Sequence, residues 1–233
     1  MRMLSVDTAT DVCGLGLSVG GCSKLELMLT QKLTHATILL EGIRNALALA
    51  KWDLAELDAL AVTRGPGSFT GLRIGISTMK GIALALDKPL IGVSSLEVLA
   101  HQAPQGFPLV CPMIDARRKE VYWSLYRRSE SGLELAQPEQ AGSVSEATGH
   151  IDAPCLFIGS GAALYAPKLK EQWEESAFLK GAELNAPRPG VIAHLAAVRM
   201  EQGLLEDIRQ FKPVYLRKAD AQLRQWMGSP QGR

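Results

Sequence analysis

The stretch Met3-Leu-Ser-Val-Asp-Thr-Ala-Thr10 decides the fold. It is a short apolar run, typical of a buried strand, that ends in an aspartate and a polar turn. Two more short apolar segments follow at 12–19 and 24–29, and Gly20-Gly21 marks a tight turn between them. This spacing predicts three consecutive strands joined by short turns.

Helical and strand patterns alternate after the third strand. The helical segments 34–51 and 70–86 enclose a buried strand at 57–63, and a strand at 89–93 leads into a third helix that ends near 102. The order three strands, helix, strand, helix, strand, helix is typical of a mixed sheet covered by helices.

The second half of the chain repeats this order in degenerate form. Leu109 to Asp115 is again an apolar run that ends in an aspartate. Strands are expected next at 120–127, 133–136 and 155–158, and helices at 162–174 and 190–205. The repeat predicts an α/β fold with two related subdomains, each a mixed β-sheet flanked by helices.

The join between the two halves falls in the loop chemistry of 102–108. We expect a first subdomain at 1–103, a second at 104–216 and a basic tail at 217–233. By position the last long helix belongs to the second subdomain; the alternative is that it packs back on the first.

The composition is that of a globular protein. Hydrophobic residues make up 47% and charged residues 21% of 233 positions, which is enough for a sizeable core. A net charge of +1 gives no overall attraction to nucleic acid or to an anionic membrane. The chain has neither a run of about 20 apolar residues nor a cationic leader, so we expect a cytoplasmic protein without membrane contact.

Neither metal nor nucleophile chemistry is indicated by the residue spacing. The four histidines are far apart and form no HxxxH or HExxH pair, and Ser68 is displaced from the centre of a GxSxG elbow. We therefore expect no metal ligand and no catalytic residue. The cysteines form no CxxC pair and are expected to be reduced core thiols, at Cys13, Cys22, Cys111 and Cys155.

The densest cluster of turn residues is Gly65-Pro-Gly-Ser-Phe-Thr-Gly71, between a predicted strand and a predicted helix. Backbone N–H groups of such a loop can converge on an anion. The GxxxxGK[ST] pattern is missing, however, and Lys80 lies more than two turns into the helix. The favoured interpretation is that the glycines permit a sharp turn and close packing of the helix.

The two helical segments 34–51 and 70–86 carry apolar residues over arcs too wide for one sheet face to cover. One hypothesis is that the pair forms a subunit interface; the alternative is two ordinary core helices covered by the third helix. The residues expected in the interface are Ile38, Leu39, Ile43, Leu47, Phe69, Leu72, Arg73, Ile76, Met79 and Lys80.

Two strand-end aspartates and a glycine-rich turn suggest a degenerate nucleotide-type cleft between the subdomains. Carboxylates at such strand ends can orient a metal-bound water, and a glycine turn can admit phosphate oxygens. The alternative is that these residues only begin turns. The residues concerned are Asp7, Thr8, Asp115, Gly159 and Gly161.

Five segments occur in a specific order and spacing: Asp7-Thr-Ala-Thr10, Arg64-Gly-Pro-Gly-Ser-Phe-Thr-Gly-Leu-Arg-Ile-Gly75, Gly92-Val-Ser-Ser-Leu-Glu97, Asp115-Ala-Arg-Arg-Lys-Glu-Val-Tyr122 and Pro213-Val-Tyr-Leu-Arg217. With these segments the chain resembles the bacterial TsaB (YeaZ) family of tRNA threonylcarbamoyladenosine synthesis, from residue 1 to about 217. The resemblance implies an actin/hexokinase/Hsp70-like (ASKHA) fold, in agreement with the repeated order of strands and helices.

The resemblance also implies a non-catalytic subunit. The catalytic relative of this family, TsaD, binds a metal through an HxxxH-type pair, and Ser95 and Leu99 stand at those positions here. The implied role is to bind TsaD and, with the ATPase TsaE, to support transfer of threonylcarbamoyl to the adenosine at tRNA position 37, in tRNAs that read codons beginning with adenine.

Further partners and cofactors follow from the same resemblance. The first two helices are expected to contact TsaD or, when TsaD is absent, to form a homodimer, and tRNA is expected to be reached through the complex. The chain itself is expected to need no cofactor, while the complex uses ATP, Mg and a TsaD-bound metal. The alternative function is a self-sufficient nucleotide-dependent ASKHA enzyme.

The basic tail has two interpretations. In one, Lys218 and Arg224 contact the phosphates of tRNA; in the other, the segment is merely solvated.

Overall fold

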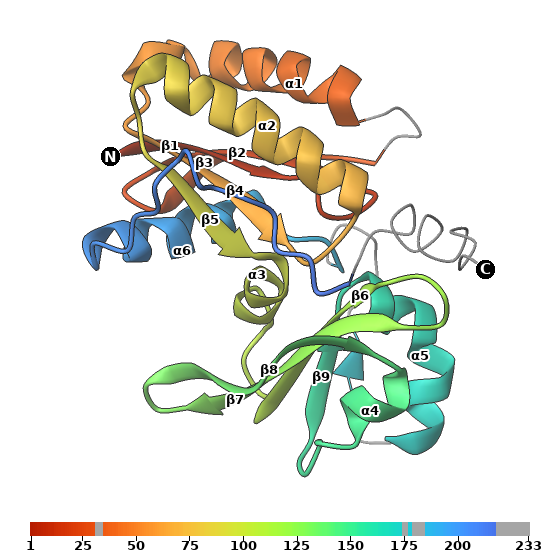
Figure 1. The fold of residues 1–233 in the computed structure, drawn as a ribbon. Helices are drawn as coiled ribbons and strands as arrows, with labels where there is room; N and C mark the ends of the chain where they lie inside the picture. Colours follow the sequence, from red (N-terminus) through yellow and green to blue (C-terminus); the bar gives the residue numbers. More distant parts are fainter. Residues whose placement is uncertain (31–34, 174–176, 179–184, 218–233) are drawn as a thin grey trace, which may run out of the picture.

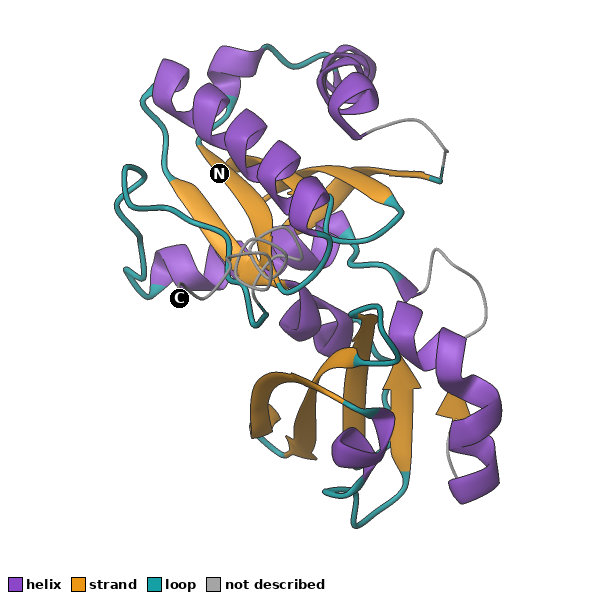
Figure 2. Ribbon diagram, turned by 45° about the vertical axis from the view of Figure 1, so that its right-hand side comes forward, coloured by secondary structure: helices purple, strands orange, loops and turns teal. Residues whose placement is uncertain are grey.

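The computed structural model describes residues 1–30, 35–173, 177–178 and 185–217. These residues fold into two lobes, each built on a five-stranded sheet (Figures 1 and 2). No helix in these ranges is long and apolar enough to cross a membrane. The predicted α/β fold with two related subdomains is confirmed.

The first sheet has the order β3-β2-β1-β4-β5. β1 pairs antiparallel with β2 and parallel with β4, so the segment that begins the chain is the central strand. β4 then pairs parallel with β5. The strands are β1 (Arg2–Asp7), β2 (Cys13–Val19), β3 (Cys22–Leu29), β4 (Ala59–Gly65) and β5 (Leu90–Ser94).

The second sheet repeats this arrangement, with the order β10-β9-β6-β7-β8. Its central strand β6 pairs antiparallel with β7 and parallel with β9, as β1 does with β2 and β4. The topology therefore places Asp7 and Asp115 at equivalent strand ends. The strands are β6 (Leu109–Asp115), β7 (Val121–Ser129), β8 (Gly132–Gly142), β9 (Cys155–Ile158) and β10 (Ala177–Phe178).

Helices cover both faces of the first sheet. α1 (His35–Ala50) and α2 (Phe69–Leu86) lie on one face, and α6 (Pro189–Glu201) lies on the other (Figure 1). Side chains alternate along β1: Leu4 packs under α1 and α2, while Met3 packs against α6. The last long helix therefore packs on the first sheet, far from its neighbours in sequence. A short 3₁₀ helix, η1 (Leu54–Glu56), follows α1.

The short helix α3 (Ser95–His101) lies between the two sheets. Val98 packs in the core under α6, whereas Leu96 and Leu99 pack against the second sheet. On its other face the second sheet is covered by α4 (Val144–Thr148) and α5 (Ser160–Gln172). α3 is thus the structural joint between the subdomains.

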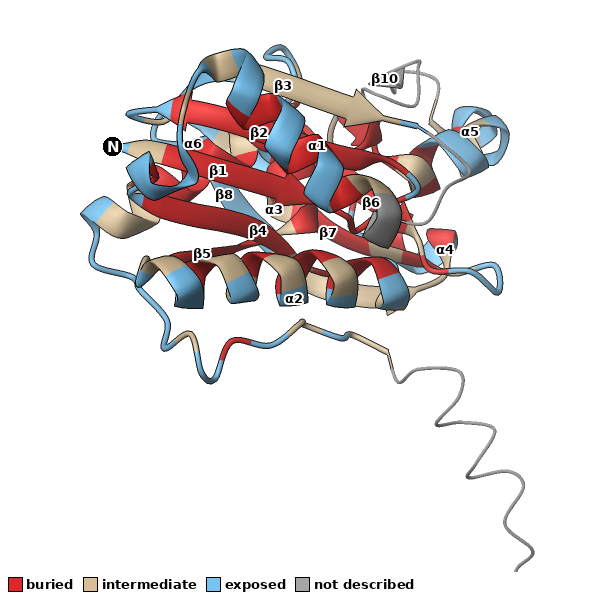
Figure 3. Ribbon diagram, turned by 90° about the horizontal axis from the view of Figure 1, so that it is seen from above, coloured by how far each residue is buried: buried red, intermediate tan, exposed pale blue. Residues whose placement is uncertain are grey.

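After α6 the chain returns along α2 (Figure 3), and we call residues 204–217 the C-terminal strap. Phe211 anchors the strap, since its side chain is buried in the core of the first subdomain. Lys218 and Arg224 of the expected basic tail lie outside the described residues.

Three of the four cysteines are buried as expected. Burial raises the pKa of Cys13 and of Cys155 to about 12, so both stay protonated thiols at neutral pH. The expectation of a core thiol is wrong for Cys22, which is exposed because it begins the edge strand β3 directly after the Gly20-Gly21 turn.

Candidate functional site

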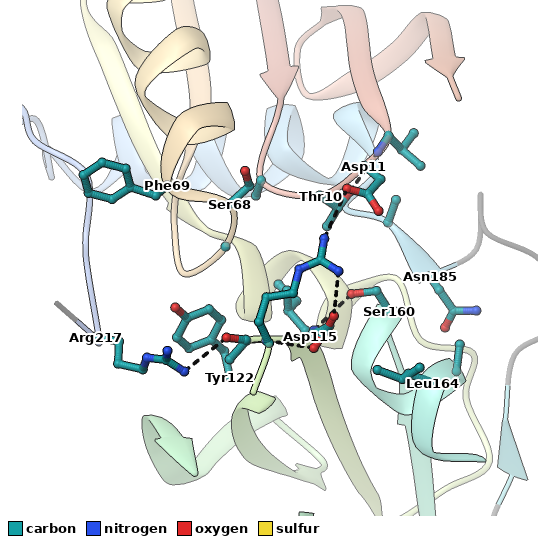
Figure 4. Close-up of a pocket in the computed structure, with 18 of the residues that line it drawn as sticks. Thr10, Asp11, Ser68, Phe69, Asp115, Tyr122, Ser160, Leu164, Asn185 and Arg217 are labelled. Atoms are coloured by element: carbon teal, nitrogen blue, oxygen red, sulfur yellow. Dashed lines mark hydrogen bonds and ion pairs between the residues drawn. The ribbon is translucent and has the colours of Figure 1, made fainter. Parts of the chain in front are cut away.

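A cavity of about 640 Å³ lies between the two subdomains (Figure 4). The loop after β1 and the start of α2 form its wall on the first subdomain, and the loop after β6 and the start of α5 form the opposite wall. Two residues of the strap, together with Asn185 and Ala186 before α6, complete the lining. Polar and aromatic lining residues include Thr10, Asp11, Ser68, Phe69, Asp115, Arg117, Tyr122, Ser160, Asn185, Tyr215 and Arg217.

Asp115 lines this cavity, as expected for a cleft residue. Its backbone N–H donates to Ser160 Oγ at 3.2 Å, and its Oδ1 accepts the backbone N–H of Arg117 at 2.8 Å. The guanidinium of Arg117 lies 3.4 Å from Asp115 Oδ2 and 4.0 Å from Asp11 Oδ1. Arg117 therefore lies between the two walls at the exposed edge of the cavity, where its side chain is 75% and that of Asp11 93% exposed.

Asp7 does not line the cavity, which corrects the expectation of two facing carboxylates. Its side chain is fully buried, and its Oδ1 accepts from Thr63 Oγ1 at 2.6 Å and from the N–H of Ala9 at 3.2 Å. Asp7 Oδ2 has no hydrogen-bond partner among the described residues. Loss of solvation on burial outweighs these hydrogen bonds and raises the pKa of Asp7 to about 7.

Thr8 is likewise buried and serves the packing of α2. Its Oγ1 donates to the carbonyl of Gly71 at 2.8 Å. A Cβ on Gly71 would lie 2.0 Å from the Thr8 carbonyl oxygen, and one on Gly75 would lie 2.2 Å from Thr8 Oγ1. The glycines of this segment are thus required by close packing, in line with the favoured sequence interpretation.

Gly159 and Gly161 do not line the cavity either; their neighbour Ser160 does. Gly159 has φ +108°, and its N–H donates to Asn185 Oδ1 at 2.7 Å. A Cβ at Gly159 would lie 2.2 Å from the Met113 carbonyl oxygen, and one at Gly161 only 3.0 Å from Val121 Cγ1. Both glycines let α5 start close against β6.

The two α3 positions at which the resemblance places metal ligands are packed in the protein interior. Ser95 and Leu99 are fully buried, and Leu99 contacts the second sheet. Within the described ranges no group of three or more His, Cys, Asp and Glu residues lies close enough together to hold a metal ion. A serine hydroxyl and an isobutyl group do not fit a metal centre.

Most of the expected interface residues lie in the core instead. They lie on the inward faces of α1 and α2, because the first sheet needs a complete apolar layer on this side. The residues concerned are Leu39, Ile43, Leu47, Leu72, Ile76 and Met79, all at most 7% exposed. Ile38 is partly buried against the same core.

The remaining three expected interface residues contact the strap. Phe69 stacks on Tyr215 with 4.8 Å between ring centroids, and Arg73 Nε donates to the hydroxyl of Tyr215 at 3.1 Å. Lys80 Nζ donates to the carbonyl of Arg209 at 3.2 Å. These three side chains of α2 therefore contact a distant part of the same chain.

Comparisons with known proteins identify the family. A family model described as TsaD, tRNA N6-adenosine threonylcarbamoyltransferase, matches residues 29–225. The protein TsaB of Escherichia coli strain K12 is 33% identical over 223 residues, covering 93% of this chain and 95% of that protein. TsaB of Bacillus subtilis strain 168 is 30% identical, covering 98% and 99%. This chain belongs to the TsaB family.

Solved structures agree with this assignment. YeaZ from Pseudomonas aeruginosa superposes with a TM-score of 0.78 at 32% identity, covering 92% of this chain and 99% of that chain. Component A of (R)-2-hydroxyglutaryl-CoA dehydratase from Acidaminococcus fermentans, at 10% identity, gives a TM-score of 0.53 and covers 86% and 99%. The latter likeness concerns the fold alone, which is the ASKHA fold.

The α1–α2 pair of this TsaB chain carries an exposed surface that the sequence interpretation did not include. Figure 3 shows exposed positions along both helices above a buried sheet. Leu40, Leu49 and Leu84 are 59%, 69% and 55% exposed. Helical phase relative to the buried residues is the signal that would have found these positions. We define the outward surface as Leu40, Ala48, Leu49, Leu84 and Ala85.

Proposed function

We propose that this TsaB chain is a non-catalytic subunit in the formation of threonylcarbamoyladenosine at tRNA position 37. In this proposal it binds and activates TsaD together with the ATPase TsaE. The tRNAs are those that read codons beginning with adenine. ATP, Mg and the metal are needed by the complex, and this chain holds none of them.

The observation that carries the proposal is the interior of α3. Ser95 and Leu99 stand where the family resemblance places a metal-binding pair; both are fully buried, and Leu99 packs against the second sheet. An imidazole at position 95 would require space that the neighbouring core side chains fill, and one at position 99 would bury a polar ring in apolar packing. A subunit built in this way depends on another protein for the metal and for the transfer step.

The outward surface of α1 and α2 is the proposed contact with TsaD. Exposed leucines on two adjacent helices present apolar area to water, and covering it is favourable by about 25 cal/mol per Å². Small residues of α2 on the same side, among them Ser77 and Gly81, allow another helix to approach closely. When TsaD is absent, we expect the same surface to form a homodimer.

A reconstitution assay tests the proposal. TsaD, TsaE, threonylcarbamoyl-AMP and unmodified tRNA are combined with and without this chain, and the chain is also assayed alone. We expect product only when both this chain and TsaD are present. Product without this chain would contradict the accessory role.

One observation favours a second candidate, a self-sufficient nucleotide-dependent enzyme. The cavity is of a size typical for small-molecule sites and is lined by Asp115, Arg117 and Tyr122. Against it stands Asp7, whose carboxyl group faces Thr63 in the core and cannot orient a ligand in the cavity. Product or ATP turnover by the isolated chain would support this candidate.

A further inference from the structure

Residues 211–217 of the strap join the two subdomains through three successive sets of contacts. The first is the anchor at Phe211, which packs under the guanidinium of Arg64 with 5.6 Å to the ring centroid. Next to it, the N–H of Val214 donates to the carbonyl of Arg64 at 2.7 Å. These contacts fix the strap to the end of β4.

The second set of contacts lies on the first turn of α2. Tyr215 stacks on Phe69 and accepts from Arg73, whose guanidinium also lies 3.8 Å from the ring centroid of Phe69. Tyr215 is 40% exposed, and Arg73 is exposed as well. This group therefore lies on the exposed side of the first turn of α2, about three turns from Leu84, and through Phe69 and Tyr215 it also lines the cavity.

The third set lies on the second subdomain. Arg217 Nη1 donates to the carbonyl of Ala116 at 3.2 Å and pairs with Glu120 Oε2 at 2.6 Å. Both partners belong to the turn between β6 and β7. Tyr215 contacts α2, and Arg217, two residues later, contacts the wall of the cavity on the second subdomain.

The turn that receives Arg217 is strained. Arg117, Arg118 and Lys119 all have left-handed backbone conformations, with φ of +63°, +55° and +66°. Such conformations are unfavourable for residues with a Cβ and persist only where surrounding contacts hold them. The turn's own bonds include Glu120 N–H to Arg117 O at 3.0 Å and Ala116 N–H to Glu120 O at 3.1 Å.

This strained turn positions the guanidinium that lies at the exposed edge of the cavity. Arg117 lies between Asp115 on the second subdomain and Asp11 on the first, and Figure 4 shows these two aspartates on opposite walls. A turn that relaxes would move Arg117 away from Asp11 and open this side of the cavity. Arg217, at the end of the strap, bonds to Ala116 and Glu120 of this turn and can therefore stabilise its strained conformation.

We propose that the strap is a coupling element: a partner that docks on α2 stabilises the strap, the strap stabilises the turn 115–120, and Arg117 then closes the cavity. The physical reason is that covering Arg73 and Tyr215 removes water that competes for their hydrogen bond. The proposal rests on the proposed function only in that the docking partner is TsaD.

Hydrogen exchange of the isolated chain tests the first link. In Arg217→Ala we expect the amides of Ala116 and Glu120 to exchange about tenfold faster, as loss of a charged hydrogen bond implies. Lys212→Ala is the matched control, since it removes a cation from an exposed position of the same strap and should leave both amides unchanged. Unchanged exchange in Arg217→Ala would overturn the proposal, provided that the variant keeps the wild-type far-ultraviolet circular dichroism.

Addition of TsaD tests the second link. In wild type we expect TsaD to slow exchange at Ala116 and Glu120. Because coupling is reciprocal, Arg217→Ala should weaken TsaD affinity by the factor by which docking protects the turn, which we expect to be about fivefold or more. Lys212→Ala should bind as wild type does.

The outcomes separate the two proposals. If TsaD does not bind the wild-type chain at all, the proposed function fails. If TsaD binds and protects α1 and α2, but exchange in the turn and the affinity of Arg217→Ala are both unchanged, the docking account stands and the coupling is refuted.

Discussion

Asp7 and Asp115 end equivalent central strands, yet their environments are opposite. Asp7 is fully buried on the α6 side of the first sheet and bonded to Thr63, and its pKa is raised to about 7. Asp115 opens into the cavity with a side chain that is 20% exposed and paired with Arg117. Topology fixes where a side chain starts, but the packing around the strand end decides whether it can meet a ligand.

The same contrast divides α2 itself. Its inward residues, such as Ile76 at 5% exposure, complete the core, while Leu84 on the outward side is 55% exposed. A Cβ on Gly75 would collide with Thr8, whereas a Cβ on Gly81 would meet no atom of the described residues within 4 Å. Buried and exposed positions therefore alternate within a few residues of α2. The pairs Ile76 and Leu84, and Gly75 and Gly81, can each be compared by mutation.

The largest effect is expected from Ile76→Asp. A carboxylate without a partner in the core should cost about 3–5 kcal/mol and unfold much of the first subdomain. The matched change Leu84→Asp should cost only about 1 kcal/mol, because at this exposed position aspartate only lowers the helix propensity and places an unfavourable negative charge near the C-terminal end of α2. Urea titration monitored by circular dichroism measures both; a folded Ile76→Asp with wild-type stability would break the contrast.

Asp7→Asn should change how stability depends on pH. With a folded pKa of about 7 against an ordinary value of 3.8, the folded chain keeps a proton that the unfolded chain releases between these values. Wild-type stability should therefore fall as pH rises from about 4 to about 7, by a few kcal/mol in order of magnitude, and level off above that.

The Asp7→Asn variant should lack this part of the slope and should be the more stable chain at pH 8. Asp115→Asn, at the open strand end, serves as the control and should keep the wild-type slope. Unfolding in urea at several pH values gives the comparison. If the free energy of unfolding depends on pH in the same way for wild type and Asp7→Asn, burial does not raise the pKa of Asp7.

The smallest effects are expected at the two glycines of α2. Gly75→Ala must displace Thr8 and should destabilise by about 1–3 kcal/mol, whereas Gly81→Ala adds a helix-favouring residue in open space and should stabilise by about 0.5–1 kcal/mol. Thermal unfolding distinguishes the signs. A shift in the same direction for both variants would contradict the packing of α2 on Thr8.

The order of elements is predictable from the sequence, for local reasons. Strand and helix periodicity, the Gly20-Gly21 turn and the repeat of an apolar run ending in aspartate are all visible within a few residues. The duplication follows from that repeat, and both sheets have the matching order.

The site is less predictable, because it depends on contacts between distant residues. Nothing near Phe69 or Lys80 in sequence indicates that residues 209–215 cover that side of α2. Nor does the aspartate in Asp7-Thr-Ala-Thr10 reveal that Thr63 donates to its carboxylate. The wide apolar arcs are visible in the sequence, but only the phase set by the sheet shows that Ile76 faces inward and Leu84 outward.

The most direct test of the central claim compares Leu84→Asp with Asp115→Asn in the reconstituted synthesis of threonylcarbamoyladenosine by TsaD and TsaE. If the chain acts by docking, Leu84→Asp should remove most of the product while folding normally, and Asp115→Asn should support a rate near that of wild type. Loss of product in Asp115→Asn with full activity of Leu84→Asp would contradict the account and make the cavity the functional centre.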